Sequence, residues 1–229
     1  MKDIVTDVFF DLDHTLWDFE KNSAITFNKI LKTHKVNLKV QEFLEAYAPI
    51  NFKYWKAYRE EKIPKEVLRY KRLKDTFDEF SYKIDDELIH ILSDEYIKEL
   101  PHQNHLFNNT IVILEYLKNS GYDLHIITNG FEEVQEGKLR KAAIMGFFTH
   151  VINSEMVGVK KPNPKIFEFA LEKAIVDPEK SVMIGDSLEA DIIGAKNVGM
   201  HTIHFNSNKE KKHDHCIIVD DLIEIKEFL

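Results

Sequence analysis

The chain lacks several features that would place it in particular classes of protein. Its 229 residues include one cysteine, Cys216, so no internal disulfide can form and a reducing compartment is expected. No segment approaches the roughly 18 consecutive apolar residues that span a membrane, and the apolar N-terminal run is interrupted by Asp7. Acidic residues outnumber basic ones by 39 to 31, which disfavours binding to nucleic acid. These absences predict a cytoplasmic protein that binds neither nucleic acid nor a membrane.

Short apolar runs rich in β-branched residues recur along the chain, and helical patterns separate most of them. The runs are Ile4–Phe10, Tyr122–Thr128, His150–Asn153, Ser181–Gly185, His201–Phe205 and Cys216–Val219. One helix is expected to end before Gly121, another to begin at Pro164, and a third to run from about Leu188 to near Gly199. This alternation predicts an α/β fold with a mostly parallel sheet and helices on both faces.

One long interval breaks the alternation. From about Phe19 to Leu100 the sequence contains no convincing strand but four helical patterns, and aromatic residues crowd the segment. We interpret this interval as an all-helical insertion that follows the first strand.

Polar side chains collect where the predicted strands end. They are Asp11 and Asp13 after the first strand, Thr128, Asn129 and Gly130 after the second, Lys161 after the third, and Asp186 and Asp191 after the fourth. Ligands of open parallel sheets bind at the carboxyl ends of the strands. The sequence therefore predicts one functional site at that edge.

The aspartates of this site would repel one another. Two unit charges about 4 Å apart cost roughly 4 kcal/mol at an effective dielectric constant near 20. Several such pairs would consume much of the usual stability of a domain, about 5–15 kcal/mol. A hard cation such as Mg²⁺ relieves this repulsion, prefers oxygen ligands and accepts phosphate oxygens as well. The pattern thus predicts a magnesium site built for a phosphate group.

In this order and spacing, the segments "DLDHT", "TNG", "GVKKP" and "GDSLEAD" resemble the four signature motifs of the haloacid dehalogenase-like hydrolase superfamily. The resemblance implies a Rossmann-like core made of residues 1–16 and 101–229. It also implies that residues 17–100 form an all-helical type 1 cap, inserted after the first strand.

The resemblance also implies a role for each motif residue. Asp11 matches the nucleophile that forms an aspartyl-phosphate, and Asp13 matches the general acid and base. Thr128, with the backbone N–H groups of Asn129 and Gly130, matches the phosphate-binding set, and Lys161 matches the lysine that steadies the nucleophile and the phosphoryl group.

The metal ligands implied by the resemblance are the Asp11 and Asp186 carboxylates and the Asp13 backbone carbonyl. Asp191 resembles a supporting acid, and whether it touches the metal directly stays open. Because dehalogenases of this superfamily generally lack an acid at the position of Asp13, its presence favours a phosphatase.

Other segments of the sequence bear on the substrate. Segments such as "ITNGF", "EMVGVKKPNPKIF" and "INFKYWKAY" are similar to a bacterial branch of pyrimidine 5′-nucleotidases, which hydrolyse nucleoside monophosphates. Aromatic side chains can stack on a base, so Trp17, Phe19, Trp55 and Phe131 are candidate pocket residues, although each could be purely structural.

Alternatives to a nucleotidase also remain. They are a phosphosugar phosphatase such as an acylneuraminate 9-phosphatase, a phosphomutase, a haloacid dehalogenase and a non-catalytic protein that binds a phosphorylated ligand. The sequence does not distinguish a monomer from a homodimer.

A second polar cluster lies near the C-terminal end. His201, His204, His213 and His215 suggest a zinc site, but they lack the closed tetrahedral spacing of such sites. The segment Asn206–His215 is expected to be an exposed loop.

Overall fold

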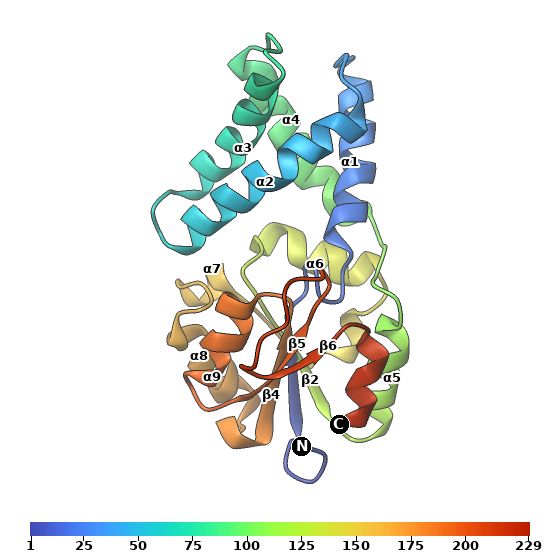
Figure 1. Ribbon diagram of the computed structural model, residues 1–229, viewed down its shortest axis with the longest axis vertical. Coiled ribbons are helices and arrows are strands. Elements are labelled where there is room, and N and C mark those ends of the chain that lie inside the picture. Colours follow the sequence, from blue (N-terminus) through green and yellow to red (C-terminus); the bar gives the residue numbers. More distant parts are fainter. The chain divides into compact units, whose positions relative to one another are not determined.

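A computed structural model describes all residues from 1 to 229 (Figure 1). The chain forms two compact units, one made of Met1–Phe19 with Asn104–Leu229, and the other made of Glu20–Gln103. Within the first unit, the departing and returning chain segments are paired. The Asp18 N–H donates to the His105 carbonyl (3.1 Å), and the Phe107 N–H donates to the Leu16 carbonyl (3.0 Å).

The first unit is built on a six-stranded sheet in the order β3-β2-β1-β4-β5-β6, with every neighbouring pair parallel. The strands are β1 (Asp7–Phe10), β2 (Asp123–Thr128), β3 (His150–Asn153), β4 (Ser181–Gly185), β5 (His201–Phe205) and β6 (Ile217–Val219). In register, Phe10 lies opposite Ile126 of β2 and Ile184 of β4, so the residues that follow these strands meet at one edge. The predicted parallel α/β fold is confirmed.

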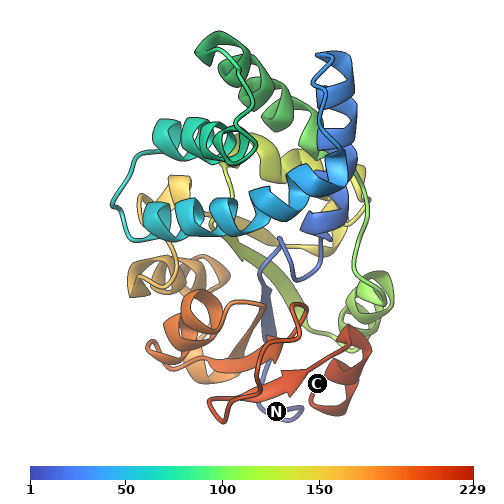
Figure 2. The same ribbon diagram turned by 45° about the horizontal axis from the view of Figure 1, so that its top comes forward.

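Helices cover both faces of this sheet (Figures 1 and 2). One face carries α5 (Thr110–Asn119) and the short C-terminal helix η5 (Leu222–Glu227), and the other carries α8 (Pro164–Ala174) and α9 (Gly194–Lys196). The core beneath α8 and α9 is mainly apolar, with Phe9, Ile127 and Met183 from the sheet packed against helix residues such as Phe167. Burial on both faces explains why the strands read as continuous apolar runs.

Short helices and 3₁₀ turns connect the longer elements of the chain. They are α6 (Glu132–Lys141), α7 (Ser154–Val157) and the 3₁₀ turns η1 (Leu100–His102), η2 (Met145–Phe147) and η3 (Pro178–Lys180). The helix expected from Leu188 begins as a π-helical segment, η4 (Leu188–Ile193), and becomes α-helical only at Gly194. The wider π-helical turn occurs together with a hydrogen bond from the Ser187 N–H to Asp191 Oδ2 (3.0 Å). This bond holds the Asp191 side chain against the preceding turn.

The second unit consists of four α-helices, the number expected from the sequence, and ends with the 3₁₀ turn η1. They are α1, which begins at the boundary residue and spans Phe19–Thr33, then α2 (Val40–Arg59), α3 (Lys65–Glu79) and α4 (Asp86–Glu99). Its core is aromatic: Phe27 stacks on Tyr96 with ring centroids 4.5 Å apart and also packs against Tyr47 at 4.7 Å. The aromatic residues of this segment therefore serve largely to hold its helices together.

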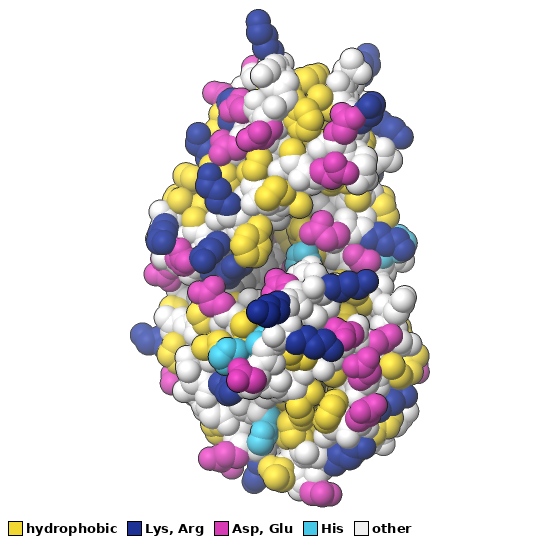
Figure 3. All heavy atoms as spheres, in the orientation of Figure 1, with side chains coloured by type: hydrophobic (Ala, Val, Ile, Leu, Met, Phe, Trp, Pro, Cys, Tyr) yellow, Lys and Arg dark blue, Asp and Glu magenta, His cyan; other side chains and the backbone are white.

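The charge distribution on the surface agrees with a sequence that contains 39 acidic and 31 basic residues. Acidic and basic side chains are interspersed over the face drawn in Figure 3. No helix combines the length and the apolar character needed to cross a membrane.

Candidate active site

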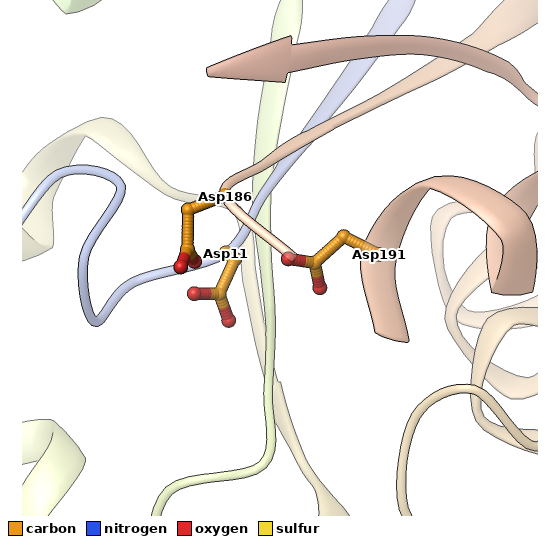
Figure 4. A group of neighbouring side chains, drawn as sticks. All are labelled: Asp11, Asp186 and Asp191. Atoms are coloured by element: carbon orange, nitrogen blue, oxygen red, sulfur yellow. The ribbon is translucent and has the colours of Figure 1, made fainter. Parts of the chain in front are cut away.

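Three carboxylates meet at the carboxyl edge of the sheet (Figure 4). Asp11 directly follows β1, Asp186 directly follows β4, and Asp191 lies on η4. One oxygen of each side chain lies within 4.8 Å of the others. The chain brings these groups together because β1 and β4 are adjacent, parallel and in register.

One buried cation lies between two of these carboxylates. The Lys161 side chain is 2% exposed, and its Nζ lies 2.5 Å from Asp11 Oδ1 and 2.7 Å from Asp191 Oδ1. It also donates to the Ile127 carbonyl at 2.6 Å. Burial alone lowers the pKa of Lys161, but the Asp11 and Asp191 charges outweigh burial and raise that pKa to about 12. Lys161 therefore stays charged throughout the physiological range.

A single lysine does not balance the cluster. Burial raises the pKa of Asp11 to about 8, with the Asp191 and Asp186 charges acting in the same direction and Lys161 opposing them. Burial, followed by the Asp191 charge, also raises the pKa of Asp186 to about 8. Without further positive charge, Asp11 and Asp186 therefore hold their protons more strongly than free carboxyl groups do. An all-oxygen donor set with an excess of negative charge fits a hard divalent cation.

The Asp13 carboxylate lies apart from this cluster and is held by helix α6. Lys138 Nζ lies 2.6 Å from Asp13 Oδ1 and 2.9 Å from Oδ2, and Gln135 Nε2 donates to Oδ2 at 3.1 Å. The Lys138 side chain is only 3% exposed because its ammonium group lies over the Trp17 ring, 4.4 Å from the centroid. Neither Lys138 nor Gln135 is a candidate from sequence reasoning.

The loop after β2 packs against the loop that carries Lys161. Asn129 Oδ1 accepts from the Lys161 N–H (2.8 Å), and Asn129 Nδ2 donates to the Lys161 carbonyl (3.0 Å), so the two loops are joined by a reciprocal pair. The Thr128 hydroxyl accepts hydrogen bonds from the Gly130 N–H (3.0 Å) and from Gln135 Nε2 (2.6 Å). A side chain at Gly130 has no room, because its Cβ would lie 1.9 Å from Gln135 Nε2. The predicted phosphate-binding residues therefore form one ordered turn.

The candidate pocket aromatics are placed differently from one another. Trp17 is fully buried in the first unit beneath Lys138, and Phe131 is buried at the start of α6. Trp55 lies on α2 in the second unit, half-buried, with its ring edge-on to Tyr58 at 5.7 Å. A substrate-binding role for Trp17 and Trp55 stays a prediction.

Comparisons with known proteins agree with the geometry. Residues 8–205 match the family described as haloacid dehalogenase-like hydrolase. The pyrimidine 5′-nucleotidase PynA of Streptococcus pneumoniae is 32% identical over 207 residues, covering 90% of this chain and 86% of that protein. A glyceraldehyde 3-phosphate phosphatase of Methanothermobacter thermautotrophicus is 41% identical over 131 residues, covering 54% of this chain and 58% of that protein.

A solved structure is similar along nearly the whole length. The HAD-hydrolase YfnB of Bacillus subtilis, crystallised with magnesium, superimposes with a TM-score of 0.88 at 26% identity and covers 98% of both chains.

Proposed function

Because the chain belongs to the haloacid dehalogenase-like hydrolase family and is a hydrolase of phosphoric monoesters, we propose that it acts through an aspartyl-phosphate with Mg²⁺ as cofactor. The observation that carries the proposal is the buried contact between Asp11 and Lys161, next to two further carboxylates. A nucleophilic carboxylate must be ionised, and Lys161 supplies the nearest fixed positive charge.

In the proposed reaction, Asp11 attacks phosphorus and the leaving oxygen departs with a proton from Asp13. Lys161 stays on Asp11 and stabilises negative charge on the phosphoryl oxygens as it develops. The N–H groups after Thr128 hold the same oxygens. Asp13 then removes a proton from the water that hydrolyses the aspartyl-phosphate, which returns Asp11 to its starting state.

The Asp11 and Asp186 carboxylates and the Asp13 backbone carbonyl are the proposed ligands of Mg²⁺. A bound divalent cation would offset the charge of these carboxylates and of the phosphate, which would let the anionic nucleophile and substrate approach each other. Asp191 serves as a supporting acid in this scheme, since it forms an ion pair with Lys161 and accepts a hydrogen bond from the Ser187 N–H.

For the substrate we propose a pyrimidine nucleoside 5′-monophosphate. The support is the similarity to a pyrimidine 5′-nucleotidase over 90% of the chain. In this proposal residues 1–16 and 101–229 form the catalytic core, residues 17–100 form the cap, and Trp17 and Trp55 contribute to substrate binding. A phosphosugar is the second candidate, because a glyceraldehyde 3-phosphate phosphatase is 41% identical over the part it shares.

Release of inorganic phosphate tests both levels of the proposal. The panel contains UMP, dUMP, dTMP, purine monophosphates, glyceraldehyde 3-phosphate and an aryl phosphate, each with Mg²⁺ and with a chelator. We expect the highest kcat/KM for the pyrimidine nucleotides and loss of activity with chelator. Activity that survives chelation would contradict the metal assignment, and a preference for the sugar phosphate would overturn the substrate assignment alone.

A further inference from the structure

A chain of hydrogen bonds joins the segment after β5 to the turn that carries Asp186. His204 lies on β5 and is 2% exposed, and its Nε2 is 2.7 Å from the Asp186 carbonyl oxygen. Its other ring nitrogen, Nδ1, is 2.8 Å from His213 Nε2. The His215 N–H in turn donates to His213 Nδ1 at 3.2 Å. The loop predicted to be exposed is exposed over most of its length, and His213 within it folds back onto His204.

The partners of this chain determine where each proton lies. A carbonyl oxygen only accepts, so His204 Nε2 carries a proton and donates to Asp186. In the neutral ring His204 Nδ1 is then an acceptor, and it takes the proton of His213 Nε2. His213 Nδ1 must consequently accept, which is the role that the His215 N–H requires. All three bonds are satisfied by one pair of neutral tautomers.

The ring geometry supports hydrogen bonding rather than a metal bridge. The planes of His204 and His213 differ by 11°, and their nitrogens (2.8 Å) are far closer than their centroids (5.0 Å), so the rings meet edge to edge. Two imidazole nitrogens bound to one zinc at about 2.0 Å in tetrahedral geometry would be about 3.3 Å apart. Burial, followed by the neighbouring His204 and His215, lowers the pKa of His213, which favours its neutral ring.

The Thr15 hydroxyl donates to the Asp186 carboxylate at Oδ1 (3.4 Å), and two further hydrogen bonds hold the backbone of the same turn. On one side the Ser187 N–H donates to Asp191 Oδ2 (3.0 Å), and on the other His204 donates to the Asp186 carbonyl (2.7 Å). We propose that His204, itself oriented by His213, is a positioning residue that holds the Asp186 carboxylate in the place where it binds the divalent cation. The proposal rests on the proposed function, and it adds a contribution from the loop at Asn206–His215.

Direct metal binding gives the first test. Calorimetric titration with Mn²⁺ or Mg²⁺ measures the affinity of the wild type and of His204→Leu without any substrate. Loss of a residue that orients a metal ligand typically costs about 10–100-fold in affinity, and we expect at least a tenfold loss here. Equal affinity of the two proteins would overturn the proposal.

His201→Leu is the matched control. His201 lies on the same strand and also contacts a backbone carbonyl, that of Glu179 (3.1 Å), but this contact is at the other end of β5. We expect wild-type affinity from this variant. A similar loss in both variants would mean that damage to the strand, rather than positioning of Asp186, lowers the affinity, and the proposal would be rejected.

Two further variants separate positioning from packing. His204→Gln retains a side-chain N–H donor and should recover much of the lost affinity, whereas recovery no better than with leucine would contradict the hydrogen bond as the cause. His213→Leu leaves the buried His204 ring in place and removes only the hydrogen bond that orients it. We therefore expect a smaller loss of metal affinity than in His204→Leu. The His213 variant also provides the test if His204→Leu fails to fold, and unchanged affinity would then count against the proposal.

Amide hydrogen exchange supplies a readout that needs no metal. The Ser187 amide should exchange faster in His204→Leu than in the wild type, because the Asp186–Ser187 peptide loses the hydrogen bond that its carbonyl accepts. Unchanged exchange would contradict the positioning role. If the wild type binds metal yet releases no phosphate, the proposed function fails while this comparison stays valid.

Discussion

Replacement of Lys161 by methionine tests whether one ammonium group stabilises the carboxylate cluster. The side chains have similar length, so the change removes the charge and three polar contacts, to Asp11, Asp191 and the Ile127 carbonyl. Removal of one partner of a buried ion pair typically destabilises a protein by about 3–5 kcal/mol. We expect a loss of that size in the free energy of unfolding at alkaline pH without metal.

The loss should depend on pH in a defined direction. The pKa values of Asp11 and Asp186 rise from 3.8 to about 8, so these carboxyls favour the folded state at low pH and lose that contribution as pH rises through 8. Without Lys161 the pKa of Asp11 rises further, and each unit is worth about 1.4 kcal/mol. Over pH 5.5 to 9 the extra destabilisation should therefore grow by about 1–2 kcal/mol.

Urea unfolding at pH 5.5 and at pH 9, each with and without Mg²⁺, measures the effect. Lys160→Met is the control, since it removes a neighbouring lysine that is only half-buried. Mg²⁺ should restore part of the stability of the Lys161 variant at pH 9. An equal loss at both pH values, or a loss no larger than that of the control, would refute the electrostatic reasoning.

Three further outcomes are expected. Asp11→Asn should abolish phosphate release while the far-ultraviolet circular dichroism stays unchanged, and measurable turnover would exclude Asp11 as the nucleophile. Mg²⁺ should raise the melting temperature more at pH 9 than at pH 5.5, because at the lower pH it must displace protons from Asp11 and Asp186. Scanning calorimetry measures the two shifts. A larger shift at pH 5.5 would argue against these residues as ligands. Lys138→Met should lower kcat at least about tenfold for a nucleotide. The loss should be much smaller for an aryl phosphate, because its leaving group needs no proton. Equal losses in steady-state assays would indicate that Lys138 does not act through Asp13.

The parts of the molecule that follow from local patterns were predictable from the sequence. The six strands read as apolar runs because both faces of the sheet are buried, and Pro164 begins α8 where the sequence places it. The sequence was sufficient to predict that Asp11 and Asp186 lie close together. Each of them directly follows a strand, and the ends of parallel strands meet at one edge of the sheet.

The contacts of Lys138 and His204 could not be predicted in the same way. A lysine on a short, strongly charged helix ordinarily faces water, but the Trp17 and Phe19 rings lie beneath Lys138, which is a buried partner of Asp13. His204 looks like a strand residue beside a histidine-rich loop, a pattern that also suggests zinc. Its contact with Asp186 depends on the register of β5 against β4, in which Gly185 lies opposite His204. Tertiary placement, rather than residue type, decides both cases.

The paired backbone at residues 16–18 and 105–107 has a consequence for how this protein can be rebuilt. Because the two chain segments are already hydrogen-bonded there, a tight glycine-containing turn could replace everything between them without disturbing the sheet. Such a shortened polypeptide would retain all four loops that carry the chemistry, since each arises from the strand-bearing unit. Other helical segments could then be inserted at the same point of the chain.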